Sequence, residues 1–281
     1  MNLCNERELR DLLGRHGFRF TKSMGQNFLI NPDIPAAIAE ASGAGQDCGV
    51  LEIGPGVGSL TVELARRAAK TVSVELDRAL LPILTETLSD CPNAEVVPGD
   101  ALKLDLDALA TEKFPGLTPI VCANLPYNIT SPILEKLILA PRFRSVTVLL
   151  QKEVAERLAA PDGSGDGGAF SLFLRYHMEP ELLFAVSREN FLPRPKVDSA
   201  VLRCTRRTSP AVETEDEAYF FRVVRGAFLL RRKTIVNSLA AALPELPKDA
   251  IRNAVTACGL SETVRGERLT LQNFADLSRR L

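Results

Sequence analysis

Between Gly49 and Leu150, apolar residues form short, nearly continuous runs that alternate with segments of helical periodicity. Short apolar runs are typical of strands buried on both faces, and the longer periodic segments are typical of helices. Strands that alternate with helices in this way predict a mostly parallel α/β sheet. The expected strands are 49–53, 71–75, 95–98, 119–123 and 145–150, and the expected helices are 58–68, 77–89 and 131–139.

The pattern changes after this region. Two further strands, 180–187 and 197–204, are joined through the proline-rich stretch Phe191–Pro195 and predict an antiparallel pair at one edge of the sheet. The polar segment Arg206–Glu217 is typical of a linker, and residues 161–168 (PDGSGDGG) are typical of a mobile loop. The helices expected after the linker are 217–230, 232–242, 248–258 and 270–280. The chain therefore divides into predicted domains of residues 1–205 and 206–281.

The N-terminal segment alternates charged residues with leucine and lacks the apolar stretch of a signal peptide. It predicts a short helix, then an arm from Phe18 to Leu29, then a helix from Pro32 to Glu40 with Asn31 as its N-cap.

Composition narrows the class of protein. Hydrophobic residues make up 46% of the 281 residues and charged residues 25%, which is enough to build a sizeable core and excludes a disordered chain. A run of about 18 uncharged apolar residues is missing, so we expect no membrane span. The six cysteines are far apart and the chain has two histidines, which argues against a zinc site or a disulfide framework. We expect a soluble, reduced, cytoplasmic protein without a metal.

The net charge of −1 conceals a division along the chain. Residues 1–187 carry 17 basic and 24 acidic side chains, a net charge of −7, whereas residues 188–281 carry 17 and 11, a net charge of +6. Such an asymmetry suggests a polyanionic partner, although solvated basic surfaces are also common.

A glycine-rich loop, Glu52–Gly58, follows the first expected strand. A dinucleotide-binding loop would place its third small residue at position 59, but that residue is Ser59 and the glycine comes one position earlier; no Walker lysine follows. This spacing disfavours an NAD-dependent oxidoreductase. A tight strand–helix turn without a ligand is the other interpretation.

Acids follow the next two strands. Glu75 ends the second strand, where a carboxylate can bind ribose hydroxyls, and Asp100 follows the third, beside Ala101, within reach of an adenine amino group. Each acid alone could be an exposed strand-end residue, but both share one edge of the sheet with the glycine loop. A ligand with ribose and adenine but no pyrophosphate fits best, and S-adenosylmethionine is such a ligand.

The sequence Asn124-Leu125-Pro126-Tyr127 follows the fourth expected strand. The Asn124 amide oxygen and the carbonyl of Leu125 or Pro126 could accept both hydrogens of an adenine amino group, and Tyr127 could stack on the extruded base. A simple helix-entry turn, with Thr130 as its cap, is the alternative.

These motifs together resemble the ribosomal RNA adenine N6,N6-dimethyltransferases, and the resemblance covers most of the chain. It rests on Lys22–Leu29, Glu52–Gly58, Asn124–Tyr127, Gln151–Val154, Phe191–Val201 and Arg231–Thr234. The resemblance implies a Rossmann-like, S-adenosylmethionine-dependent methyltransferase sheet in residues 1–205 and a small all-α, rRNA-binding domain in residues 206–281. One departure is Gly167-Gly168, where the family usually has a tyrosine before the glycine.

The resemblance also implies residue roles. Phe191 would form a second aromatic wall for the base opposite Tyr127, with ordinary core packing as the alternative. The catalytic set would be Asn124, Leu125, Pro126, Tyr127 and Phe191; the cofactor would contact Asn27, Leu29, Gly54, Gly56, Glu75, Asp100, Ala101 and Asn124; and RNA would contact Arg194, Lys196, Arg231, Arg232 and Lys233, the last three at the start of a helix.

The expected substrate is a hairpin near the 3′ end of small-subunit rRNA, in which two adjacent adenines are modified. The partner would be the assembling 30S particle, bound by a monomer. Two alternatives remain at this point: methylation of a large-subunit adenine that confers antibiotic resistance, and a ribosome-assembly factor that binds rRNA without catalysis.

Overall fold

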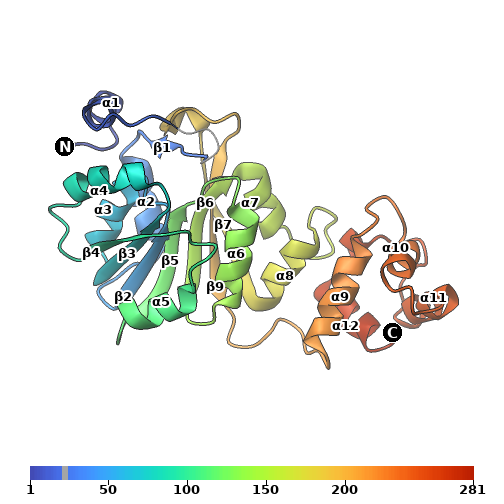
Figure 1. Ribbon diagram of the computed structural model, residues 1–281. Helices are drawn as coiled ribbons and strands as arrows, with labels where there is room; N and C mark the ends of the chain where they lie inside the picture. Colours follow the sequence, from blue (N-terminus) through green and yellow to red (C-terminus); the bar gives the residue numbers. More distant parts are fainter. Residues whose placement is uncertain (21–24) are drawn as a thin grey trace. The chain divides into compact units, whose positions relative to one another are not determined.

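The structure is a computed structural model that describes residues 1–20 and 25–281, and its packing divides the chain into two compact units. The first unit comprises residues 1–155 and 181–206, and the second comprises residues 156–180 and 207–281 (Figure 1). Three residues of the N-terminal motif, Lys22, Ser23 and Met24, lie outside the described residues.

A seven-stranded sheet forms the centre of the first unit in the described chain. Its strand order is β4-β3-β2-β5-β6-β9-β7; β2 to β6 pair in parallel, and β9 is antiparallel to β6. The predicted α/β class is therefore confirmed, and the two late strands are neighbours at one edge, as expected. The strands are β2 (Cys48–Ile53), β3 (Lys70–Glu75), β4 (Ala94–Pro98), β5 (Thr118–Asn124), β6 (Ser145–Gln151), β7 (Met178–Val186) and β9 (Ser199–Arg206).

Helices cover the sheet because its central strands are apolar on both faces. Every residue of β2 is buried, which explains why its sequence has no alternation of polar and apolar residues. On one face, Ile38 and Leu64 pack in the same cluster as Val50, Ile120 and Leu149 of the strands. The helices of this unit that follow the arm are α2 (Asp33–Ala41), α3 (Ser59–Ala65), α4 (Leu81–Thr87), α5 (Leu106–Lys113) and α6 (Thr130–Leu139).

The strand order reverses direction between β2 and β5. From β2 the chain adds β3 and β4 on one side, and it then adds β5 and β6 on the other side. In open α/β sheets, the carboxyl ends of the strands at such a reversal form a crevice in which ligands bind. The glycine loop after β2 and the turn after β5 both begin at this crevice.

The N-terminal segment forms α1 (Glu6–Arg15), which Asn5 caps by accepting from the Arg7 and Glu8 amides. The arm then pairs with a distant part of the chain, which the sequence did not predict. Its β1 (Phe28–Leu29) is antiparallel to β8 (Phe191–Leu192).

The predicted N-cap of α2 is displaced by one residue. Pro32 occupies the cap position, and the Asn31 side chain accepts a hydrogen bond from the Asp33 amide at 3.1 Å. Asn31 therefore still satisfies an amide of the first turn.

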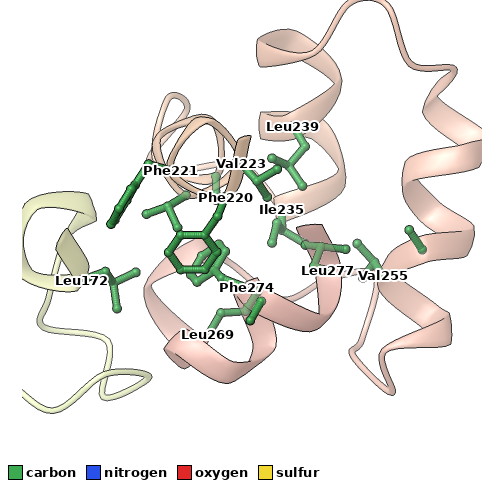
Figure 2. Packing of buried hydrophobic residues seen from close by; sticks show 14 of the residues in the cluster. Leu172, Phe220, Phe221, Val223, Ile235, Leu239, Val255, Leu269, Phe274 and Leu277 are labelled. Atoms are coloured by element: carbon green, nitrogen blue, oxygen red, sulfur yellow. The ribbon is translucent and has the colours of Figure 1, made fainter. Parts of the chain in front are cut away.

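The second unit is helical and has its own core (Figure 2). Phe220 and Phe274 are fully buried there, and Leu172 and Tyr176 belong to the same cluster. A Cβ atom on Gly226 would lie 2.8 Å from Cβ of Ala242, so the close approach of these two helices requires glycine. The main helices are α8 (Ala169–His177), α9 (Glu217–Ala227), α10 (Ile235–Ala242), α11 (Lys248–Ala257) and α12 (Leu271–Ser278).

Residues 156–180 pack with the C-terminal helices, and α8 was not predicted. Residues 161–168, expected to be a loop, form turns that are hydrogen-bonded to the C-terminal part of this unit. Asp162 accepts from the Leu271 amide at 2.9 Å, and Arg268 donates to the Ser164 carbonyl at 2.6 Å. The domain boundary expected at residue 205 stays a prediction.

One expectation about the second unit was wrong. Arg231, Arg232 and Lys233 do not begin a helix; they lie in the turn between α9 and α10, which starts at Ile235 after its cap residue Thr234. The Lys233 amide donates to the Leu230 carbonyl at 2.8 Å and closes this turn instead. Across the described ranges, no helix combines the length and the apolar character needed to cross a bilayer.

Candidate functional site

A pocket lies at the carboxyl ends of the parallel strands in the first unit. It encloses about 1030 Å³ of space without protein atoms, open solvent included. The predicted site residues that line it are Asn27, Leu29, Gly54, Gly56, Glu75, Asp100, Ala101, Asn124, Leu125, Pro126 and Tyr127. The fold therefore brings together residues from four strand ends and the N-terminal arm.

The glycine loop needs glycine for its backbone shape. Gly54, Gly56 and Gly58 have φ values of +69°, +61° and +91°, in the left-handed region that other residues rarely adopt. A Cβ atom on Gly56 would also lie 3.0 Å from the ring of Phe28 in the arm. The loop thus presents bare backbone to the pocket and lets the arm pack closely over it.

Glu75 lies at the end of β3 and is 6% exposed. Its Oε1 accepts a hydrogen bond from the Asp77 amide at 2.7 Å. Burial raises the pKa of Glu75 to about 6, although backbone amides partly offset this effect. A buried carboxylate at a pocket wall is suited to accept hydrogen bonds from ligand hydroxyls.

Glu52, for which the sequence suggested no individual role, is a second buried acid at the pocket. It is 1% exposed, and Thr61 and Ser73 donate to its Oε2 at 2.6 and 2.7 Å. Burial raises the pKa of this carboxyl to about 7. The signal in the sequence was an acid within an apolar strand, two residues before Gly54.

Asp100 follows β4 and is partly exposed at the pocket. Its Oδ1 accepts from the Leu102 amide at 3.0 Å, which fixes the side chain in a local turn. Ala101 is buried beside it. The pair forms the wall farthest along the sheet from β5.

Asn124 ends β5, and its Nδ2 donates to the backbone carbonyl of Asn27 at 3.1 Å. A carbonyl can only accept, so this bond determines which amide atom is nitrogen and directs Oδ1 away from it. The Asn27 side chain donates in turn to the Gly25 carbonyl at 3.0 Å. The arm therefore orients the amide of Asn124.

The backbone carbonyls of Leu125 and Pro126 differ in the hydrogen bonds that they accept. The Pro126 carbonyl accepts from the Ile129 amide at 3.2 Å and from Thr130 Oγ1 at 3.3 Å, so it stabilises the entry of α6. Among the bonds found between described residues, none ends on the carbonyl of Leu125. Of the two acceptors suggested by the sequence, Leu125 is thus the one less committed to the fold.

Tyr127 lies in the same turn, and its hydroxyl is 2.6 Å from Oγ of Ser199 on β9. Burial raises the pKa of this phenol, so it is neutral at physiological pH. The hydrogen bond anchors the far end of the ring and limits its rotation.

Phe191, predicted as a second aromatic wall for the base, lies in the hydrophobic core. It is 2% exposed, pairs with Leu29 in the β1–β8 ladder and packs in the core cluster with Ile38 and Val201. It does not belong to the lining of the pocket. The structure thus shows the packing role, and contact with a target base stays a prediction.

The predicted RNA-binding residues are exposed. In the first unit, Arg194 forms an ion pair with Glu189, and Lys196 lies two residues farther along the chain. In the second unit, Arg231, Arg232 and Lys233 are adjacent in the α9–α10 turn. An exposed turn with three adjacent cations is able to contact phosphates without loss of a structural ion pair.

The whole chain is similar to known proteins. Residues 17–278 match the family described as ribosomal RNA adenine dimethylase. The chain is 47% identical over 277 residues to the ribosomal RNA small subunit methyltransferase A of Geobacillus sp. strain WCH70, covering 97% of this chain and 95% of that protein. It is 42% identical to the protein of the same name from Bacillus mycoides strain KBAB4, covering 100% and 97%.

Two solved structures are also similar. The 23S rRNA methyltransferase ErmE superposes with a TM-score of 0.71 at 31% identity, covering 90% of this chain and 99% of that one. A dimethyladenosine transferase from Plasmodium falciparum gives a TM-score of 0.71 at 27% identity, covering 89% and 95%. Since the family match extends over nearly the whole chain, this protein belongs to the ribosomal RNA adenine dimethylase family.

Proposed function

We propose that this protein dimethylates the N6 amino groups of two adjacent adenosines in the 3′-terminal hairpin of small-subunit rRNA, with S-adenosylmethionine as methyl donor. Support for the substrate comes from full-length similarity to proteins named small subunit methyltransferases at 42–47% identity. The observation that carries the chemistry is the bond from Asn124 to Asn27, which leaves Oδ1 of Asn124 available as an acceptor in the pocket.

The pocket fits this cofactor. Gly54 and Gly56 line the pocket with backbone that carries no side chain, and we assign the methionine moiety to this part of the wall. We assign the ribose to Glu75 and the adenine to Asp100 and Ala101, with Asn27 and Leu29 on the arm side. The cofactor supplies an electrophilic methyl group on a sulfonium.

The chemical task of the protein is to make an amine reactive. The lone pair of the adenine amino group is delocalised into the ring, so the amine is a poor nucleophile. Oδ1 of Asn124 and the carbonyl of Leu125 would accept its two hydrogens, favour a pyramidal nitrogen and stabilise the positive charge that develops on it. A strong general base is unnecessary, because the methylated ammonium is acidic enough to lose its proton afterwards.

Tyr127 would hold the base. Stacking on an aromatic ring contributes about 1–3 kcal/mol per base, and a ring anchored through Ser199 loses little further freedom on binding. Alignment of the amine with the methyl donor would supply much of the remaining rate enhancement.

Basic residues would position the RNA. We assign phosphate contacts to Arg231, Arg232 and Lys233 in the second unit and to Arg194 and Lys196 in the first. Phosphate contacts set register and orientation, whereas the pocket selects the base.

The structural similarity to ErmE makes large-subunit rRNA the second candidate substrate. Incubation of unmodified small and large ribosomal subunits with a methyl-labelled cofactor, followed by mapping of the labelled nucleotide, separates the two. We expect label in two adjacent adenosines of the small subunit. Label in the large subunit alone would overturn the proposed substrate, and absence of label in both would favour a non-catalytic assembly factor.

A further inference from the structure

Gln26, in the arm just before β1, has an amide oxygen without a partner among the described residues. Its Nε2 donates to Oδ2 of Asp77 at 2.8 Å. Since a carboxylate only accepts, this bond identifies the other amide atom as Oε1. Oε1 is buried and accepts no hydrogen bond from any residue that the structure describes.

The place of Gln26 in the fold suggests what would satisfy this oxygen. Gln26 lines the pocket at the strand ends, together with Asp77. Buried polar atoms in folded proteins nearly always have a partner, because an unmade hydrogen bond does not compensate for the lost contact with water. A donor from a bound molecule would satisfy Oε1.

Both carboxylate oxygens of Asp77 already accept hydrogen bonds within the protein. Its Oδ1 accepts from the Ala79 amide at 2.9 Å, and its Oδ2 is taken by Gln26. Asp77 therefore acts as a positioning residue that holds the amide of Gln26, whereas Gln26 contributes the atom that can meet a ligand.

The neighbouring groups indicate which donor is involved. The Asp77 amide donates to Oε1 of Glu75 at 2.7 Å, so Gln26, Asp77 and Glu75 form one connected chain of hydrogen bonds. Glu75 is the residue proposed to bind ribose, and a ribose has two vicinal hydroxyl donors. Oε1 of Glu75 already accepts from the Asp77 amide, and Oε1 of Gln26 would add a further acceptor on the same wall of the pocket.

We propose that Gln26 is a second ribose-binding residue, whose Oε1 accepts a hydrogen bond from one hydroxyl of the cofactor. The inference rests on the proposed function, since it requires a nucleoside ligand in this pocket. The arm would then take part in recognition of the ribose. A cofactor with both ribose hydroxyls would contact Glu75 at the end of β3 and Gln26 in the arm.

Calorimetry with S-adenosylhomocysteine and its 2′-deoxy and 3′-deoxy analogues tests this assignment. Gln26→Met keeps the length of the side chain and removes the acceptor. We expect about 5- to 20-fold weaker binding of S-adenosylhomocysteine by this variant, the range for one hydrogen bond. With the analogue that lacks the relevant hydroxyl, the variant and the wild type should bind within about twofold of each other.

Gln46→Met is the matched control, because Gln46 is an exposed glutamine outside the pocket that donates to the Arg67 carbonyl. It should bind all three ligands like the wild type. Thermal unfolding of each variant checks that the fold is retained.

The outcomes are distinct. An equal loss of affinity for all three ligands would show that Gln26 only ties the arm to Asp77, and would overturn the proposal, as would unchanged binding. Methylthioadenosine, which lacks the amino acid, provides a further check: a loss that disappears with this ligand would place the donor on the ammonium instead. If the wild type bound none of these ligands, the proposed function itself would fail.

Discussion

The side-chain amide of Asn124 is bonded to the backbone carbonyl of Asn27, 97 residues earlier in the chain, with 3.1 Å between the two atoms. This bond joins the turn proposed to receive the target adenine to the arm proposed to cover the cofactor. It engages one hydrogen of the Asn124 NH2 group and so identifies the other amide atom as the oxygen, which can act as an acceptor. Orientation of the Asn124 amide therefore depends on a correctly placed arm.

Asn124→Ala removes this acceptor, and methyl transfer should fall by about 10²–10³-fold, as for loss of one group that stabilises charge in a transition state. Cofactor affinity should fall less than about tenfold, because most proposed cofactor contacts remain. Single-turnover transfer to small subunits and calorimetry measure the two quantities. Asn253→Ala, at an exposed position of α11, serves as control. Normal turnover by the Asn124 variant would contradict the assigned role.

Two substitutions at Tyr127 separate its ring from its hydroxyl. Tyr127→Phe keeps the ring and removes the bond to Ser199, so we expect nearly normal transfer and a free energy of unfolding lower by about 1 kcal/mol. Tyr127→Ala removes the stacking surface, and KM for the RNA substrate should rise by roughly 5- to 100-fold. Equal effects of both variants on transfer would show that the hydroxyl, and not the ring, is what matters.

The sequence predicted the parts of this fold that have local signals. The strands of the parallel sheet are continuous apolar runs. Gly54, Glu75, Asp100 and Asn124 lie at or just after the ends of successive strands, so a shared site at one edge of the sheet could be inferred. The turn at Arg231 was misassigned because good helix formers directly precede Thr234, whose extended conformation stops the helix from starting earlier.

Other features depend on contacts between distant segments. The β1–β8 ladder is two residues long on each side, too short for a periodic pattern, and pairs Leu29 with Phe191. That pairing places Phe191 in the core, so an aromatic in a family motif was not sufficient to predict a pocket wall. The link between Gln26 and Asp77 has no local signal either.

The buried acids should make stability depend on pH. Burial raises the pKa of Glu52 to about 7 and that of Glu75 to about 6, from 4.5. At pH values between the ordinary pKa of 4.5 and these raised pKa values, the folded protein binds more protons than the unfolded chain. The free energy of unfolding should therefore decrease as pH rises from about 4.5 to 7.

Glu52 alone should account for about 2–3 kcal/mol of this decrease. Glu52→Gln should remove that part, because a neutral amide needs no proton to be buried. Urea unfolding of the cofactor-free protein at several pH values measures the effect. Glu40→Gln, at an exposed position of α2, is the control. A pH profile of Glu52→Gln identical to that of the wild type would show that Glu52 does not titrate in this range.

Glu75→Ala should weaken binding of S-adenosylhomocysteine by roughly 10- to 100-fold, the range expected for hydrogen bonds to a charged acceptor. Calorimetry at pH 8, where the carboxyl is ionised, gives the cleanest comparison. Glu95→Ala provides the control, because Glu95 lies on the adjacent strand but is paired with Lys70 and Lys113 outside the pocket. Affinity unchanged by Glu75→Ala would remove this residue from the ribose site.

Replacement of Arg231, Arg232 and Lys233 by glutamate should weaken binding to small subunits and reduce its salt dependence. Each phosphate contact contributes about 0.7–0.9 to the slope of log K against log salt, so three contacts predict a slope smaller by about 2–3. Binding measured at four or more salt concentrations gives the slope. Arg7, Arg10 and Lys248, also exposed, can be changed to glutamate together to match the change in net charge. Since long-range repulsion affects both triple variants similarly, a greater loss of slope in the Arg231 variant identifies direct phosphate contacts, whereas equal slopes would exclude the α9–α10 turn from the RNA interface.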